Sequence, residues 1–121
     1  MRIFIDGGVK RHQLKDKRRG RIAIVMNGFK LVEDVGAVTN NQAEYMALLK
    51  ALNLALAEKV NTVKVYSDSE LLVRQLAGEY RVKDPQLRKL HKEVSRLVKR
   101  FEKFSVQWVP REKNEAGKLL A

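Results

Sequence analysis

The chain of 121 residues contains no cysteine, only two prolines and a single tryptophan. Without cysteine it can form neither a disulfide framework nor a thiolate metal site, so it suits a reducing compartment and we expect a cytoplasmic protein. Its apolar runs stay well short of the roughly 20 residues that a membrane-spanning helix needs. The N-terminus enters strand-like sequence without a signal-peptide pattern. We therefore expect no membrane partner.

Acidic residues are also scarce, with 14 Asp and Glu against 25 Lys and Arg, which gives a net charge of +11. Cations that neutralise a polyanion release its counterions, so this excess favours a nucleic-acid partner. A basic thermophilic or ribosome-associated protein, or simple solubility, would also explain this excess. Hydrophobic residues make up 45% and charged residues 32% of the chain. At this length the composition predicts one globular domain over residues 1–121.

Apolar periodicity and turn residues predict a mixed sheet with helices packed on it. The Asn27-Gly28 pair predicts a tight hairpin between the second and third strands. The expected strands cover residues 1–6, 20–28, 29–38, 62–69 and 104–109, and the expected helices cover residues 40–59, 69–78, 84–101 and 114–121.

Three acidic residues occupy informative places in this pattern. Asp6 lies in the first strand, Glu44 in the first turns of the long helix, and Asp68 at the carboxyl end of the fourth strand. Each has an ordinary explanation: Asp6 as a turn former, Glu44 as compensation of the helix dipole, and Asp68 as a helix cap. If the first and fourth strands are neighbours, however, the three carboxylates converge. Carboxylates that converge repel one another unless a hard cation such as Mg²⁺ lies between them.

Four segments, IDGG, TNNQAE, SDSELLVRQL and WVPREKN, occur in an order that resembles the type 1 ribonuclease H family, in its compact archaeal and plant-type branch. The resemblance covers almost the whole chain. It implies an α/β ribonuclease H-like fold, with a five-stranded mixed sheet in the order 3-2-1-4-5 flanked by helices. It also implies an enzyme that cleaves the RNA strand of RNA–DNA hybrids with two Mg²⁺ or Mn²⁺ ions.

By the same resemblance, Asp6, Glu44 and Asp68 are the catalytic metal ligands. Gly7 and Gly8 would allow the backbone to approach RNA, where 2′-hydroxyl groups distinguish RNA from DNA. The other residues expected to bind nucleic acid are Asn40, Asn41 and Gln42 in the minor groove, Thr39 at a DNA phosphate and Ser69 at the RNA strand. Asn40 would serve equally as a plain helix cap.

The family carries a fourth acid in its last helix, and this chain departs from that pattern. An alignment without gaps on Asn114 places Lys118 there, and a shift of one residue places Gly117 there. Three hypotheses follow. Glu115 supplies the fourth carboxylate, three acids suffice for slow cleavage, or the protein is a binding module without activity. A further alternative is another nuclease or integrase on the same fold.

Basic residues also gather in two segments of the chain. Seven Lys and Arg lie between Lys10 and Arg21, in the first hairpin connection. Others follow one face of the helix expected at 84–101. Either segment could lie along a duplex, and a solvated surface explains both equally well.

Overall fold

The computed structural model describes residues 1–11 and 18–121, without the side chains of residues 11 and 18. The basic connection expected between Lys10 and Arg21 therefore lies partly outside the described residues. Five strands form one sheet in the order β3-β2-β1-β4-β5, as the family resemblance implied. Their bounds are β1 Arg2–Arg11, β2 Arg18–Met26, β3 Phe29–Gly36, β4 Thr62–Ser67 and β5 Lys103–Trp108.

The first three strands form an antiparallel meander. Met26 pairs with Phe29 across the β2–β3 turn. Asn27 and Gly28 occupy this turn with φ angles of 51° and 84°. Both angles lie in the left-handed region that a type I′ hairpin requires and that Asn and Gly tolerate best. The hairpin predicted from Asn27-Gly28 is confirmed.

The pairing between β1 and β4 brings together residues that lie far apart in the sequence. The two strands are parallel, and Phe4 pairs with Tyr66. Asp6 lies two residues beyond Phe4, and Asp68 lies two residues beyond Tyr66. Parallel strands advance together, so the two acids lie at the same level of neighbouring strands, although β1 continues beyond Asp6 to Arg11. The expectation that the first and fourth strands are neighbours is confirmed.

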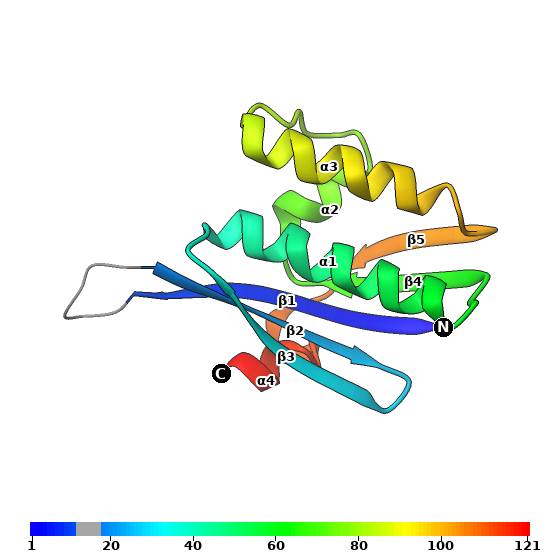
Figure 1. Ribbon diagram of the computed structural model, residues 1–121, viewed down its shortest axis with the longest axis horizontal. Coiled ribbons are helices and arrows are strands. Elements are labelled where there is room, and N and C mark those ends of the chain that lie inside the picture. Colours follow the sequence, from blue (N-terminus) through cyan, green and yellow to red (C-terminus); the bar gives the residue numbers. More distant parts are fainter. Residues whose placement is uncertain (12–17) are drawn as a thin grey trace.

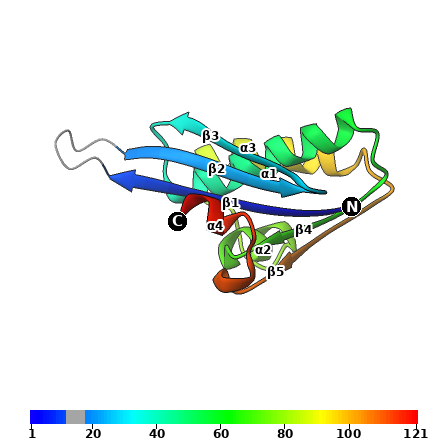
Figure 2. The ribbon, with the colours of Figure 1, turned by 90° about the horizontal axis from the view of Figure 1, so that it is seen from below.

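Helices cover both faces of the sheet (Figures 1 and 2). Helix α1 (Asn40–Ala57) packs on β1 and β2, and α3 (Pro85–Val98) packs on α1. The short helix α4 (Gly117–Leu120) lies against β1 and β2 on the opposite side from α1. Helix α2 (Glu70–Leu76) follows β4 and contacts β5. No helix in the described part of the chain is both long and apolar enough to cross a membrane.

Helix α1 approaches the sheet closely because its buried face is built largely from alanine. The alanines recur every fourth residue and are fully buried: Ala43, Ala47, Ala51 and Ala55. Residues four apart share one face of a helix. Their small side chains therefore bring the start of α1, and with it Glu44, close to β1.

The end of the chain differs from the prediction of one helix over residues 114–121. A short 3₁₀ helix covers Arg111–Lys113, and α4 begins only at Gly117. Asn114 remains outside α4 because its side chain bonds to other elements of the fold. The sequence also predicts that the first strand ends at residue 6, whereas β1 continues to Arg11 because it pairs with β2 along this length. The other element boundaries lie within three residues of those predicted.

Candidate metal centre

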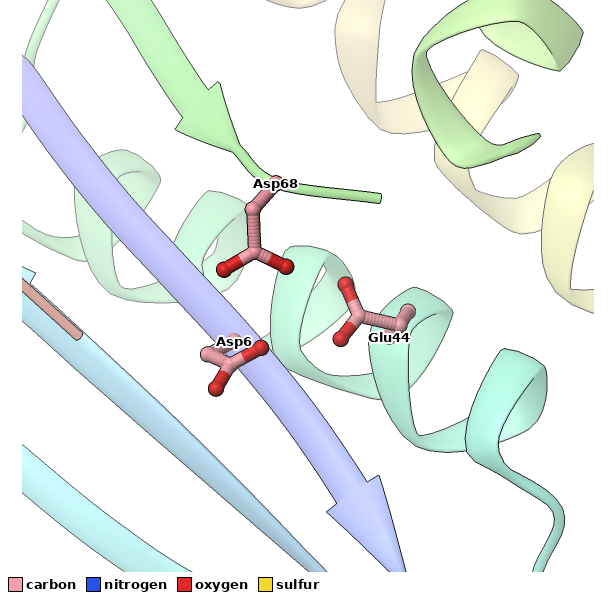
Figure 3. Close-up of side chains that lie close together, drawn as sticks. All are labelled: Asp6, Glu44 and Asp68. Atoms are coloured by element: carbon pink, nitrogen blue, oxygen red, sulfur yellow. The ribbon is translucent and has the colours of Figure 1, made fainter. Parts of the chain in front are cut away.

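Three carboxylates converge where the middle of β1 passes the carboxyl end of β4 (Figure 3). Asp6 extends from β1, Glu44 from α1 and Asp68 from the residue after β4. One oxygen from each carboxylate lies within 4.8 Å of the others. The structure therefore brings together the three acids that the sequence singled out. It does so through the β1–β4 pairing and the close approach of α1.

The two carboxylate oxygens of Glu44 have different surroundings. Its Oε1 accepts a hydrogen bond of 2.8 Å from the backbone N–H of Gly7. Its Oε2 is buried and meets no hydrogen-bond donor among the described residues. Burial, and then the nearby charge of Asp6, raises the pKa of Glu44 to about 9. A buried carboxylate oxygen of this kind needs either its own proton or a cation.

Asp6 is also buried, with 2% of its surface exposed. Burial raises its pKa, a hydrogen bond with Glu44 opposes that shift, and the charge of Asp68 adds to it. Arg111 lowers the pKa, but the net shift remains upward. Asp6 and Glu44, whose pKa values burial raises, lie together with Asp68 and provide hard oxygen ligands at one place. They fit a divalent cation such as Mg²⁺ or Mn²⁺.

Asn114 holds the Asp68 carboxylate in place. Its Nδ2 donates one hydrogen bond of 2.9 Å to Asp68 Oδ2 and another of 2.9 Å to the carbonyl oxygen of Ile5. On the other side of Asp68, the Nε1–H of Trp108 donates to the Asp68 carbonyl oxygen. The sequence analysis used Asn114 to align the last helix and did not assign it a contact with the acids. The segment WVPREKN, which ends at this residue, was the available signal of a further role.

Gly117 is the residue of the last helix that faces the acids. A Cβ atom at this position would lie 3.5 Å from Asp6 Oδ2 and 3.7 Å from Asp68 Oδ2. Lys118 is exposed, whereas Gly117 is buried. Of the two alignments considered, the one shifted by a residue matches this geometry, because Ala116 takes the buried place on the sheet and Gly117 follows it towards the acids.

Glu115 does not lie where the first hypothesis requires it. Its side chain is exposed and lines a hollow of about 380 Å³ together with Arg2, Asn27 and Gly28. Arg2 begins β1, four residues before Asp6. The described residues that place carboxylate oxygens together are Asp6, Glu44 and Asp68. The structure thus places Glu115 outside this group of three carboxylates, and its role as a fourth metal ligand stays a prediction.

The two glycines after Asp6 differ in their surroundings. A Cβ atom on Gly7 would lie 2.4 Å from the backbone carbon of Ala43 and 2.5 Å from the nitrogen of Glu44. Gly7 is therefore glycine because α1 packs against its backbone, an explanation that the family resemblance did not supply. A Cβ atom on Gly8 would meet nothing within 4 Å. Among these two residues, only Gly8 has the open space that an approaching RNA strand requires.

The residues expected to contact nucleic acid surround the start of α1. The Thr39 hydroxyl accepts from the N–H of Gln42, and the Gln42 side chain accepts from the N–H of Thr39, which forms a capping box. Asn40 Oδ1 accepts a hydrogen bond of 2.9 Å from the N–H of Val9. Ser69 caps α2 through the N–H of Leu72. These side chains are fixed by structural bonds, and Asn41 is exposed beside them.

Comparison with known proteins identifies the fold. A family model described as reverse transcriptase-like matches residues 13–121. LC11-RNase H1, solved in complex with an RNA/DNA hybrid, superposes with a TM-score of 0.80 at 28% identity and 99% coverage of both chains. A second structure of LC11-RNase H1 is 32% identical, with a TM-score of 0.75 and coverage of 98% of this chain and 90% of that one.

Two further relatives agree with this assignment. Ribonuclease HI of Halobacterium salinarum is 37% identical over 89 residues, which cover 74% of this chain and 45% of the relative. The bifunctional protein Rv2228c of Mycobacterium tuberculosis is 37% identical over 87 residues, which cover 72% of this chain and 24% of the relative. The chain thus matches less than half the length of these two proteins. The resemblance to type 1 ribonuclease H is confirmed, and the chain belongs to the ribonuclease H domains of the reverse transcriptase-like family.

Proposed function

We propose that this chain is a metal-dependent endonuclease that hydrolyses phosphodiester bonds in the RNA strand of RNA–DNA hybrids. The observation that carries the proposal is the convergence of Asp6, Glu44 and Asp68 within 4.8 Å of one another. The buried Oε2 of Glu44, which has no hydrogen-bond partner in the described part of the chain, supports it, because that atom is costly to bury unless a proton or cation meets it.

Asp6, Glu44 and Asp68 would hold the cations, either Mg²⁺ or Mn²⁺. When bound, such ions lower the pKa of water and stabilise charge on the attacking and leaving oxygens of a phosphodiester. The protein contributes the fixed positions of its ligands. Gly7 holds Glu44 through its backbone N–H, and Asn114 holds Asp68 through its side-chain amide.

The hybrid substrate is proposed from the surface around the centre. The start of α1 presents Thr39, Asn40, Asn41 and Gln42, and Gly8 leaves open space beside them. A relative of the same fold was solved with an RNA/DNA hybrid. Helix α3 adds a basic surface, in which a hollow of about 550 Å³ is lined by Lys89, Lys92, Arg96 and Lys99 together with Glu93 and Ser95. Such a surface suits a phosphate backbone.

The test is cleavage of an end-labelled RNA–DNA hybrid in Mg²⁺ and in Mn²⁺, compared with an Asp6→Asn variant. We expect products in at least one metal, none with a chelator, and none with the variant. Hybrid left intact in both metals, under conditions where the protein is folded and binds it, would reject the proposed activity.

A second candidate function is a module that binds hybrids without cutting them. The observation that favours it is Gly117, because the residue of α4 that faces Asp6 and Asp68 carries no carboxylate. Binding of the hybrid without products would support this alternative. Cleavage of double-stranded DNA in the same assay would instead indicate a nuclease of different specificity on the same fold.

A further inference from the structure

Asn114 is a fully buried polar residue beside the acid cluster, with 0% of its surface exposed. Its side chain makes three hydrogen bonds. Nδ2 donates to Ile5 O and to Asp68 Oδ2, and Oδ1 accepts from the N–H of Ala116 over 3.1 Å. Both N–H groups of the amide are therefore used.

The chemistry of these partners fixes the orientation of the amide. Rotation by 180° would place Oδ1 against a carbonyl oxygen and a carboxylate oxygen, both of which only accept hydrogen bonds. It would also turn Nδ2 towards the N–H of Ala116. Asn114 therefore presents its donors to β1 and to Asp68, and its acceptor to the backbone that leads into α4.

We propose that Asn114 is a positioning residue that fixes the Asp68 carboxylate for metal binding and couples the docking of α4 to the metal centre. This inference rests on the proposed function. Asp68 lies just after β4 and is only partly buried, so the strand pairing of β4 does not constrain its side chain. A hydrogen bond to Oδ2 fixes one carboxylate oxygen and thereby the direction of the other.

Asn114 is suited to this task because its amide carries no charge. A lysine or arginine in its place would neutralise Asp68 and repel a divalent cation. The neutral donor orients the carboxylate and leaves its negative charge available to the metal. Hydrogen-bond partners of metal ligands act in this way, and their loss typically costs about 10- to 100-fold in metal affinity or activity.

The competing explanation is that Asn114 only holds α4 to the sheet, through Ile5 and Ala116. Two variants separate the roles. Asn114→Ala removes all three hydrogen bonds. Asn114→Ser retains a hydroxyl that can accept from the N–H two residues later, as serine does in turns, but is too short to reach Asp68.

A matched control removes a buried amide whose hydrogen bonds go to residues other than the three acids. Gln75 is 5% exposed, accepts a hydrogen bond of 2.6 Å from the Tyr45 hydroxyl and donates to Arg81 O. Gln75→Ala should lower the midpoint of thermal unfolding, as Asn114→Ala should, because each variant loses buried hydrogen bonds. It should leave the metal centre intact.

The measurement is Mn²⁺ binding to the substrate-free protein by calorimetry, followed by kcat and KM on a hybrid. We expect Asn114→Ser and Asn114→Ala to bind Mn²⁺ at least about tenfold more weakly than the wild type. Their kcat should fall by a larger factor than the factor by which KM changes. Gln75→Ala should keep the wild-type metal affinity. A folded Asn114→Ser variant with wild-type affinity and kcat would overturn the inference and leave the proposed function standing.

The wild-type protein provides a test that does not depend on the folding of variants. During a Mg²⁺ titration, the side-chain amide resonances of Asn114 should shift together with the backbone N–H of Gly7, while those of Gln75 stay in place. Asn114 resonances that remain fixed while Gly7 shifts would overturn the inference. Wild-type protein that binds neither metal and cuts no hybrid would overturn the proposed function, and the inference with it.

Discussion

The backbone N–H of Gly7 donates a 2.8 Å hydrogen bond to Oε1 of Glu44, which joins β1 to α1 inside the acid cluster. This bond forms because α1 approaches the β1 backbone more closely than a side chain at residue 7 would allow. The position of Glu44 relative to Asp6 is thus set by main-chain packing. Carboxylates held by main-chain packing change little when a ligand arrives, which is the requirement for a preorganised metal centre.

Substitution of Gly7 should damage both the fold and the site. In Gly7→Ala the new methyl group would collide with backbone atoms of Ala43 and Glu44 that cannot rotate away. Forced overpacking of this kind costs about 1–3 kcal/mol, which denaturant unfolding would reveal. Gly8→Ala is the matched control, because its methyl group meets open space. Equal stability of the two variants would contradict the proposed packing role.

Replacement of Glu44 by glutamine should stabilise the metal-free protein as pH rises. The pKa of Glu44 is raised to about 9 from an ordinary value of 4.5. Between these values the folded state holds more protons than the unfolded state, so the free energy of unfolding falls as pH increases. Glutamine has no proton to lose and can still accept from Gly7.

The comparison is made by denaturant unfolding with a chelator between about pH 4 and pH 8. Near pH 4 the free energy of unfolding should change with pH in a similar way in the two proteins. By pH 8 the free energy of unfolding of Glu44→Gln, relative to that of the wild type, should have risen by at least about 1 kcal/mol. Mg²⁺ should reduce this difference in stability, because it binds and stabilises the ionised wild type. Glu44→Gln should also lose cleavage activity. Parallel stability curves across this range would contradict the shifted pKa.

Introduction of an acid at residue 117 should strengthen metal binding. A side chain there begins 3.5 Å from Asp6 Oδ2, and the φ angle of Gly117 is not in the left-handed region, so Gly117→Asp fits the backbone. We expect Mn²⁺ affinity to rise roughly tenfold, equivalent to about 1.4 kcal/mol. The metal-free variant should be less stable at pH 8, because a fourth carboxylate adds to the repulsion.

Lys118→Asp is the matched control for this prediction, because Lys118 is exposed. Like Gly117→Asp it adds one carboxylate, but one residue further along the chain, and it also removes the positive charge of Lys118. If Lys118→Asp raised Mn²⁺ affinity and Gly117→Asp did not, the alignment without gaps would be correct and the assignment from geometry wrong. Calorimetric titration of both variants decides between them.

A change at Asn40 should separate substrate binding from stability. Asn40→Asp keeps an oxygen that accepts from the N–H of Val9, so the fold should be retained. It replaces the amide donor with a negative charge beside the proposed position of the nucleic acid. We expect hybrid affinity, measured by fluorescence anisotropy in a chelator, to fall about tenfold or more, equivalent to about 1.4 kcal/mol. Unchanged affinity and salt dependence would remove Asn40 from the proposed interface.

The sequence by itself determined the order of the elements and the identity of the three acids. Local signals are strong where they depend on residues close in the chain, such as the Asn27-Gly28 turn. The capping residue at Thr39 also acts through a nearby N–H group. The acids could be selected because strand ends and helix starts are readable from periodicity, and because ordered motifs resemble a known family.

Tertiary structure decided which residues complete the centre. Asn114 reaches Asp68 from 46 residues away, and Gly117 faces Asp6 only because Ala116 is buried against the sheet. Similarly, the need for glycine at residue 7 arises from the backbone of α1, 36 residues further along. Such contacts depend on how separate elements pack, and a helix rotated by one residue turns by about 100° and presents a different side chain. The sequence therefore left residues 117 and 118 as alternatives, and the packing of α4 distinguished them.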